Sequence, residues 1–292
     1  ALPTLLQMFS TSQYMSDWLI RDPATFDLLR ITEGQPIARE VLTEEVCGEV
    51  AIARDEAMVM QTLRRYKHRE TLRIAYGDIV RGQDVSVVTR QISYLADAIC
   101  EAALRYARAT IESRFGSPMN AEDQPAQMVI LGLGKLGGEE LNYSSDIDLI
   151  FVSESDGMTR GPKSIENHEC FERVARLFCK LLSESTDLGA PYRVDLRLRP
   201  GGSQSSAVIT KEAAAHYYDN LGRTWERQAF IKARPVAGDL ELGHGLLKQL
   251  EPWIYRRYLS LADIAGIKAL KRKIEQRSLR AGEELSDVKT GH

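Results

Sequence analysis

The stretch Gly132–Phe151 decides the fold and reads G-L-G-K-L-G-G-E-E-L-N-Y-S-S-D-I-D-L-I-F. It overlaps an apolar run at Met128–Leu133 and ends in another at Ile147–Val152, and both runs predict short buried strands. Residues two apart on a strand share a face. Asp146 and Asp148 should therefore point the same way, while the apolar residues beside them turn into the core.

The glycines of Gly132–Gly137 also fit the G-x-G-x-x-G pattern of dinucleotide-binding proteins. That fold needs a full helix after the glycines, then a strand with an acidic residue at its far end. Here the next apolar run begins about ten residues after Gly137, and its acidic residues stand at its start. No Gly-Lys-Ser or Gly-Lys-Thr closes a phosphate loop either. We therefore set aside nicotinamide, flavin and phosphate-loop binding.

The pair Asp146 and Asp148 predicts a metal site. Two carboxylates side by side repel each other and are tolerated when a divalent cation neutralises them. Mg²⁺ prefers one or two carboxylates together with phosphate oxygens. The alternative, an acidic strand edge that faces solvent, stays open at this point.

A third strand is predicted at Tyr192–Leu198, where polar and apolar residues alternate strictly. The alternation puts Arg193, Asp195, Arg197 and Arg199 on one face. Beside the first pair, Asp195 is interpreted as a third metal ligand, flanked by Arg197 and Arg199 as phosphate clamps. Three carboxylates can hold two Mg²⁺ ions. A lone acid among arginines is also typical of a structural ion pair.

The rest of the chain predicts helices on both sides of this α/β part. Residues before about 115 have helical periodicity throughout, and residues 116–125 form a polar, Pro-containing linker. We expect an α+β fold with a small mixed sheet and three parts: a helical lead (1–120), the sheet core (121–210), and a helical extension that is truncated at its end (211–292). Further predicted elements are helices at 164–184, 211–220, 224–234, 240–258 and 261–280, and an edge strand at Val208-Ile209.

Composition narrows the class of protein. The 292 residues carry 38 basic and 41 acidic side chains, a net charge of −3 that argues against a basic nucleic-acid-binding protein. Residues 121–189 hold 6 basic and 13 acidic side chains, whereas residues 190–280 hold 17 basic and 9 acidic side chains. An acidic segment beside a basic one is expected for a site that binds both cations and phosphate. Apolar runs are too short for a membrane helix, and we expect no secretion signal at Ala1–Ser10. Four scattered cysteines without zinc-ligand spacing favour the cytoplasm.

The quoted motifs resemble one known family. Gly132–Phe151 is similar to the defining motif of the glutamine synthetase adenylyltransferases, bifunctional enzymes with two related nucleotidyltransferase halves. Arg193–Pro200 (R-V-D-L-R-L-R-P), Gly222–Arg234 (G-R-T-W-E-R-Q-A-F-I-K-A-R) and Arg64–Asp78 resemble it further, so that the likeness covers nearly the whole chain. The resemblance implies a polymerase-beta-like palm. It also implies that this chain is most of one catalytic half of a longer enzyme.

Glu226-Arg227 and Trp253–Tyr258 (W-I-Y-R-R-Y) look like the amino-terminal, deadenylylating half. The resemblance then implies phosphorolysis: phosphate attacks the bond between AMP and a tyrosine of glutamine synthetase and releases ADP. The carboxylates Asp146, Asp148 and Asp195 would hold the metals. Other residues would line the phosphate or the nucleotide: Gly137, Gly138, Ser145, Arg197, Arg199, Lys232 and Arg234. Implied partners are adenylylated glutamine synthetase, ADP or ATP, phosphate and, in the full-length enzyme, a PII-type regulator.

Three alternatives stay open from the sequence. The chain can be the half that adenylylates glutamine synthetase with ATP, because the two halves share the catalytic motifs. It can be a small-molecule nucleotidyltransferase, although such an enzyme needs no long helical lead. It can also be a non-catalytic docking or regulatory module, against which the intact set of three aspartates argues.

Overall fold

The computed structural model describes residues 2–11, 13–21, 23–256 and 261–281. Six helices come first, as the periodicity predicted: α1 (Leu2–Thr11), α2 (Gln13–Arg21), α3 (Ala24–Thr32), α4 (Arg39–Ala51), α5 (Glu56–Ile79) and α6 (Val85–Phe115). The α/β part follows with β1 (Ser117–Pro118), β2 (Met128–Gly132), α7 (Gly134–Gly137), β3 (Ile147–Ser153), β4 (Thr159–Arg160), α8 (Asn167–Ser183), β5 (Val194–Asp195) and β6 (Val208–Thr210). The last elements are α9 (Lys211–Leu221), α10 (Thr224–Phe230), β7 (Arg234–Gly238), α11 (Leu240–Ile254) and α12 (Leu261–Ala281).

A mixed five-stranded sheet lies at the centre of the fold. Its order is β5-β3-β2-β7, and β6 also pairs with β3. β2 runs antiparallel to β3 and to β7, whereas β5 and β6 run parallel to β3. The antiparallel β2–β3 pair, joined by the four-residue α7, is not the parallel unit of a dinucleotide-binding fold. The expected α+β class with a small mixed sheet flanked by helices is confirmed.

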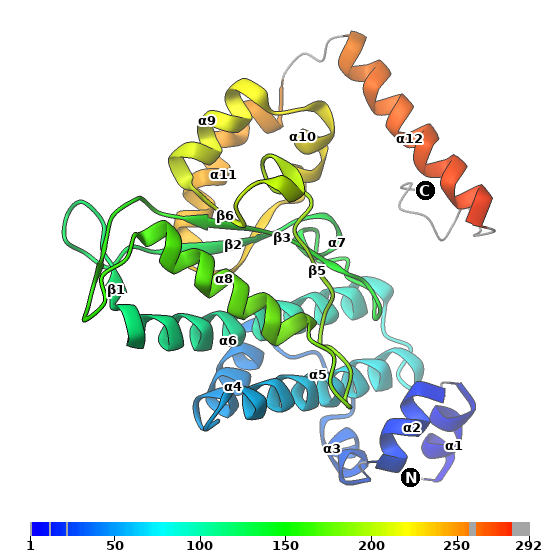
Figure 1. Cartoon of the computed structure of the whole chain (residues 1–292). Coiled ribbons are helices and arrows are strands. Elements are labelled where there is room, and N and C mark those ends of the chain that lie inside the picture. The colour runs from blue at the N-terminus through cyan, green and yellow to red at the C-terminus, as the bar shows by residue number, and fades with distance from the viewer. Residues whose placement is uncertain (1, 12, 22, 257–260, 282–292) are drawn as a thin grey trace.

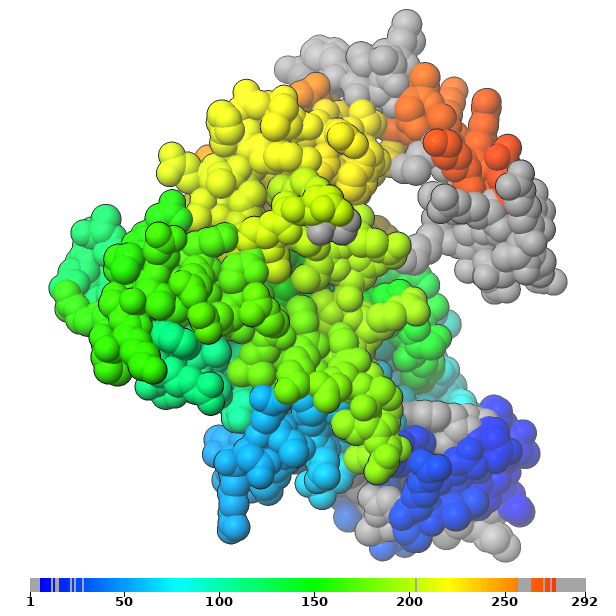
Figure 2. Space-filling view, in the orientation of Figure 1, coloured from blue at the N-terminus to red at the C-terminus, as the bar shows by residue number. Residues whose placement is uncertain are grey.

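Both faces of the sheet are buried (Figure 1). Ile130 of β2 and Phe151 of β3 pack toward α6 and α8, and α4 and α5 lie beyond α6. Their neighbours Leu131 and Ile150 turn to the opposite face, which α9 and α11 cover. Because side chains alternate along a strand, near-continuous apolar runs are what a sheet covered on both faces requires. The space-filling view shows α9–α11 and the N-terminal helices at opposite ends of the molecule (Figure 2).

Two helices predicted in the C-terminal half are shorter than expected, and the one expected at 240–258 ends at Ile254. The helix expected at 224–234 ends at Phe230, and Arg234–Gly238 instead forms β7, which pairs with β2. Pro235 therefore lies in a strand, next to a register shift in its partner between Ile130 and Leu131. A proline is tolerated there because a bulged strand needs no continuous ladder. The division into 1–120, 121–210 and 211–292 stays a prediction.

The four cysteines are free thiols. No helix within the described ranges combines the length and the apolar character that a membrane span requires.

Candidate active site

The three predicted carboxylates lie at the start of two neighbouring strands. Asp148 of β3 and Asp195 of β5 are Cα partners in the parallel pair, and Asp146 lies directly before β3. The Ile147 N–H donates to the Arg193 carbonyl at 3.1 Å and joins the two chain segments. Each aspartate is half-buried. Asp148 shares the face of Ile150 and thus lies on the side of the sheet that α9 and α11 cover.

Arginine side chains balance two of these carboxylates. The Arg193 guanidinium donates to Asp146, and Arg197 Nε lies 2.9 Å from Asp195 Oδ2. The hydrogen bond from Arg197 lowers the pKa of Asp195, which keeps that carboxyl ionised near neutral pH. Both arginines are largely exposed, 80% for Arg193 and 79% for Arg197, so neither is fixed in place by packing.

Oxygen ligands of this kind suit a hard divalent cation. Among the residues that the structure describes, no three acidic, histidine or cysteine side chains converge closely enough to form a ready-made metal cluster. Asp146 and Asp195 instead pair with exposed cationic side chains, which balance their charge. The carboxylates fit Mg²⁺ in their chemistry.

The predicted strand at Tyr192–Leu198 is wrong outside Val194 and Asp195. β5 holds only Val194 and Asp195, because the Asp195 carboxylate accepts the Arg197 N–H at 2.8 Å and turns the chain. Arg199 therefore does not share a face with the other arginines. Its guanidinium donates to the carbonyl oxygens of Leu196 (2.8 Å), Ser205 (3.0 Å) and Ser206 (3.0 Å), which closes a loop.

The glycine turn lies directly against one of the carboxylates. Gly134 has a φ of +57°, and a Cβ built there would come within 2.9 Å of Asp148 Oδ2. A side chain at this position would be strained in its backbone and would crowd the carboxylate. The Leu133 N–H also donates to the Asp148 carbonyl at 2.9 Å. The turn and β3 are thereby fixed to each other.

Gly137 and Gly138 form the end of the glycine turn. Their N–H groups donate to the carbonyls of Leu133 and Gly134, both at 3.1 Å, so these N–H groups are already used within α7. A Cβ on Gly137 would lie 2.1 Å from the Lys232 carbonyl oxygen, which makes this glycine necessary for packing. The hydroxyl of Ser145 accepts the N–H of Asn142 at 3.3 Å and shapes the loop before β3.

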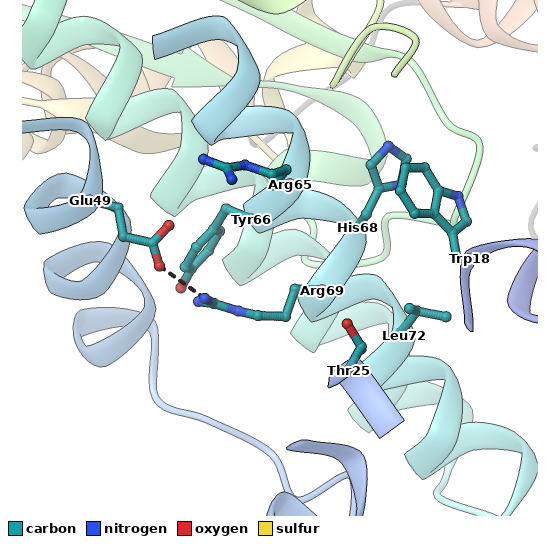
Figure 3. Close-up of a pocket in the computed structure, with 8 residues that line it drawn as sticks. All are labelled: Trp18, Thr25, Glu49, Arg65, Tyr66, His68, Arg69 and Leu72. Atoms are coloured by element: carbon teal, nitrogen blue, oxygen red, sulfur yellow. Dashed lines mark hydrogen bonds and ion pairs between the residues drawn. The ribbon is translucent and has the colours of Figure 1, made fainter. Parts of the chain in front are cut away.

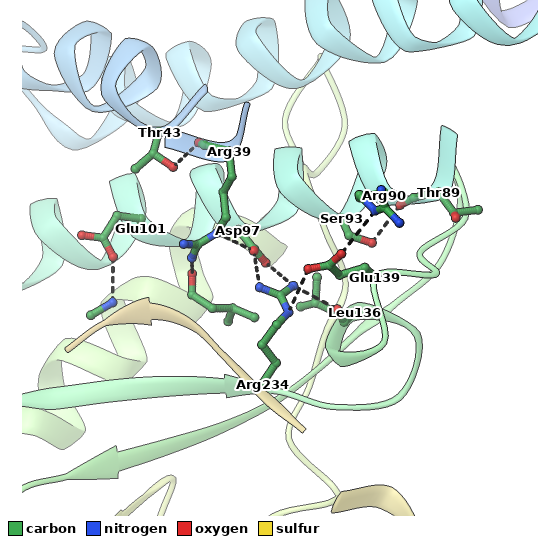
Figure 4. A network of polar contacts seen from close by, with 12 residues as sticks. Arg39, Thr43, Thr89, Arg90, Ser93, Asp97, Glu101, Leu136, Glu139 and Arg234 are labelled. Atoms are coloured by element: carbon green, nitrogen blue, oxygen red, sulfur yellow. Dashed lines mark hydrogen bonds and ion pairs between the residues drawn. The ribbon is translucent and has the colours of Figure 1, made fainter. Parts of the chain in front are cut away.

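Lys232 and Arg234 contact the glycine turn rather than the three aspartates. Lys232 Nζ lies 2.6 Å from Glu140 Oε2. Arg234 donates to the fully buried Asp97 of α6 at 2.6 Å and to the Leu136 carbonyl at 3.1 Å (Figure 4). It therefore ties α7 to α6.

Sequence reasoning missed the network of hydrogen bonds around Asp97. Arg39, at the start of α4, donates to Asp97 at 2.7 Å and to the Val236 carbonyl of β7 at 2.8 Å (Figure 4). Burial raises the pKa of Asp97, while the two guanidiniums lower it. A single acid on the apolar face of a predicted helix was the signal, because such a residue needs a cationic partner from elsewhere.

Comparison with known proteins gives the family. Residues 2–249 match the family described as glutamate-ammonia ligase adenylyltransferase. This chain belongs to that family. Among curated relatives of this family member, a protein of Nitrosococcus oceani is 41% identical over 287 residues, which are 96% of this chain and 29% of the relative. A relative from Pseudomonas putida is 39% identical over 282 residues, which are 94% of this chain and 29% of the relative.

A third relative, from Thioalkalivibrio sulfidiphilus, is 36% identical over 291 residues, 98% of this chain and 30% of its own length. All three are named bifunctional glutamine synthetase adenylyltransferase/adenylyl-removing enzyme, so their names carry both activities. This family member spans about 30% of the length of such relatives. The family resemblance of the sequence is thereby confirmed.

Proposed function

We propose that this chain is a nucleotidyltransferase unit, with a polymerase-beta-like palm, that removes AMP from a tyrosine of glutamine synthetase by phosphorolysis. The observation that carries the proposal is the pairing of Asp148 with Asp195 across β3 and β5, with Asp146 directly before β3. Three acids on two neighbouring strands, beside a glycine turn and two exposed arginines, suit phosphoryl chemistry better than a purely structural role.

Asp146, Asp148 and Asp195 would hold Mg²⁺, with two ions as the expected number. When bound, the metal supplies Lewis-acid stabilisation of charge on the phosphoryl oxygens. Arg193 and Arg197, released from their carboxylates, are then available to bind the incoming phosphate. Arg193 takes the place that the sequence assigned to Arg199, because the guanidinium of Arg199 closes a loop.

The reaction balances without an added acid or base on the protein. An oxygen of inorganic phosphate forms a bond to the α-phosphorus, and the bond from that phosphorus to the tyrosine oxygen breaks. The products are ADP and a tyrosine phenolate, which takes a proton from solvent. Phosphate is already an anion at neutral pH, so its attack needs no general base. Gly137, Gly138 and Ser145 shape the glycine turn and the loop before β3, next to the carboxylates. Lys232 and Arg234 hold that turn in place.

The choice of adenylyl removal over adenylyl transfer rests on the resemblance of Glu226-Arg227 and Trp253–Tyr258 to the deadenylylating half. Glu226 accepts the Arg223 N–H at 2.7 Å and the Tyr217 hydroxyl at 2.9 Å, so its contacts are those of a helix cap. Residues 257 and 258 lie outside the described residues. A PII-type regulator of the full-length enzyme and a cytoplasmic location belong to the same proposal.

A paired assay tests the direction. The chain is incubated with adenylylated glutamine synthetase and phosphate, and in parallel with unmodified glutamine synthetase and labelled ATP. We expect ADP release in the first reaction and no label transfer in the second. Label transfer without ADP release would assign the opposite activity. Neither activity, together with no thermal shift on adding Mg²⁺ or nucleotide, would indicate a non-catalytic module.

A further inference from the structure

Helix α5 contacts the two loops that lead into the carboxylate strands. Its first half touches the loop between α8 and β5, and its last turn touches the loop between α7 and β3. A run of basic residues on a helix is usually solvated surface, but Arg64 and Arg73 are among the most completely buried side chains that the structure describes. A buried cation needs a fixed set of acceptors, so its neighbours indicate its task.

Arg64 binds the loop before β5. Its Nε donates to the Gly189 carbonyl at 2.6 Å, and it also donates to the Glu184 carbonyl and to Met60 of its own helix. Burial lowers the pKa of this guanidinium. The loop carbonyls offset the cost of burying its charge, so loop and helix depend on each other.

Lys67 and His68 continue the same contact. Lys67 Nζ donates to the Pro191 carbonyl and lies 4.1 Å from the centre of the Tyr192 ring. His68 Nε2 is 3.1 Å from the Leu188 carbonyl oxygen. The His68 ring stacks on the ring of Trp18 of α2, with ring centres 3.6 Å apart (Figure 3).

The far end of α5 holds the other loop. The Tyr143 hydroxyl donates to Asp78 Oδ2 at 3.0 Å. Burial, together with the Asp78 charge, raises the pKa of Tyr143, so its hydroxyl keeps its proton and remains a donor. Tyr143 precedes Asp146 by three residues, and Pro191 precedes Asp195 by four.

We propose that α5 is a positioning element that sets the spacing between Asp195 and the pair Asp146 and Asp148. Lys67 and Arg64 fix the segment entering β5, and Asp78 fixes the segment entering β3 through Tyr143. None of these side chains touches the reacting atoms. The inference rests on the proposed function, because spacing of the carboxylates matters only where they share a ligand. Loss of groups that orient metal ligands weakens metal binding by roughly 10- to 100-fold.

The test measures Mn²⁺ binding, by the paramagnetic resonance signal of free Mn²⁺, in Tyr143→Phe and Lys67→Met. We expect each variant to bind Mn²⁺ at least ~10-fold more weakly than the unmodified chain. Lys180→Met is the matched control, because Lys180 also pairs with α5, at Glu56 (2.6 Å), but its ammonium holds neither loop. That control should bind Mn²⁺ normally. Lys67→Arg, which keeps a cationic donor, should recover most of the affinity.

The outcomes separate the two proposals. Normal Mn²⁺ binding by Tyr143→Phe and Lys67→Met, with weakened binding by Asp146→Asn, overturns the positioning role alone. Normal binding by Asp146→Asn, or no binding by the unmodified chain, overturns the metal site and with it the proposed function. If Lys67→Met does not fold, Tyr143→Phe decides, because Tyr143 is 40% exposed and keeps its ring. Its melting temperature should stay unchanged while Mn²⁺ affinity falls.

Discussion

Asp148 and Asp195 are Cα partners across the parallel strands β3 and β5, although the short strand β4 and the helix α8 lie between them in the chain. This pairing puts two acids at adjacent positions on one sheet, beside a third at Asp146. Mutual repulsion raises the free energy of such an arrangement unless positive charge is near. Arg193 and Arg197 supply that charge here, and both are largely exposed.

Replacing the carboxylates tests the metal site. We expect Asp148→Asn and Asp195→Asn each to lower kcat for AMP removal by ~100-fold or more, because charge stabilisation at the phosphoryl group is lost. The fold should persist, since each change also relieves repulsion. Steady-state assays on adenylylated glutamine synthetase, together with thermal melts, measure the two effects. Near-normal turnover in a folded variant would contradict the assignment.

Arg193 and Arg199 are predicted to differ although both stand in one motif. Arg193→Gln should raise the KM for phosphate about tenfold or more, because a charge-assisted hydrogen bond is lost. Arg199→Gln should instead destabilise the fold by about 1–3 kcal/mol, because loop carbonyls lose their donor. Phosphate titrations and urea denaturation of both variants compare them. The reverse pattern would restore the phosphate role that the sequence gave to Arg199.

The buried Asp97 is predicted to matter for stability. Asp97→Asn removes the negative charge shared by Arg39 and Arg234, and we expect a loss of about 3–5 kcal/mol in the free energy of unfolding. Asp123→Asn is the control, because its ion pair with Arg160 is exposed and should contribute no more than ~1 kcal/mol. Denaturant unfolding of both variants checks this. Equal effects would show that the network is not a stabilising one.

His68 predicts a dependence of stability on pH. Burial lowers its pKa to about 4 from the ordinary 6.5. Between these values the unfolded chain binds a proton that the folded chain does not, so the free energy of unfolding falls as pH falls from 6.5 toward 4. His68→Gln should show a shallower fall over this range. Urea denaturation at several pH values measures it, and identical slopes would rule out a buried neutral His68.

Much of the sheet could be predicted from local sequence. β2 and β3 follow from two apolar runs that are buried on both faces, and the glycines between them require a tight turn. Asp146 and Asp148 could be selected as candidate metal ligands because two carboxylates side by side repel each other unless a cation is near. The α8 helix followed from its apolar periodicity. Each of these features depends on residues close together in the chain.

Other features depend on partners distant in the chain. β7 (R-P-V-A-G) contains a proline and a glycine, which strands disfavour, and it forms because β2 offers it an edge to pair with. Arg193 contacts Asp146, 47 residues earlier in the chain, because β5 pairs with β3. Arg64 looks like a surface cation until the loop before β5 packs over it.

The sequence by itself determined the family, the α+β class and the three acids, because motif and periodicity are local properties. Tertiary structure decided which cation meets which acceptor: Arg234 meets Asp97, Arg193 meets Asp146, and α5 contacts the loops that lead into β3 and β5. The physical reason is that a long charged side chain has many possible partners in the unfolded chain. Only the packed fold, which removes water from most of them, selects one.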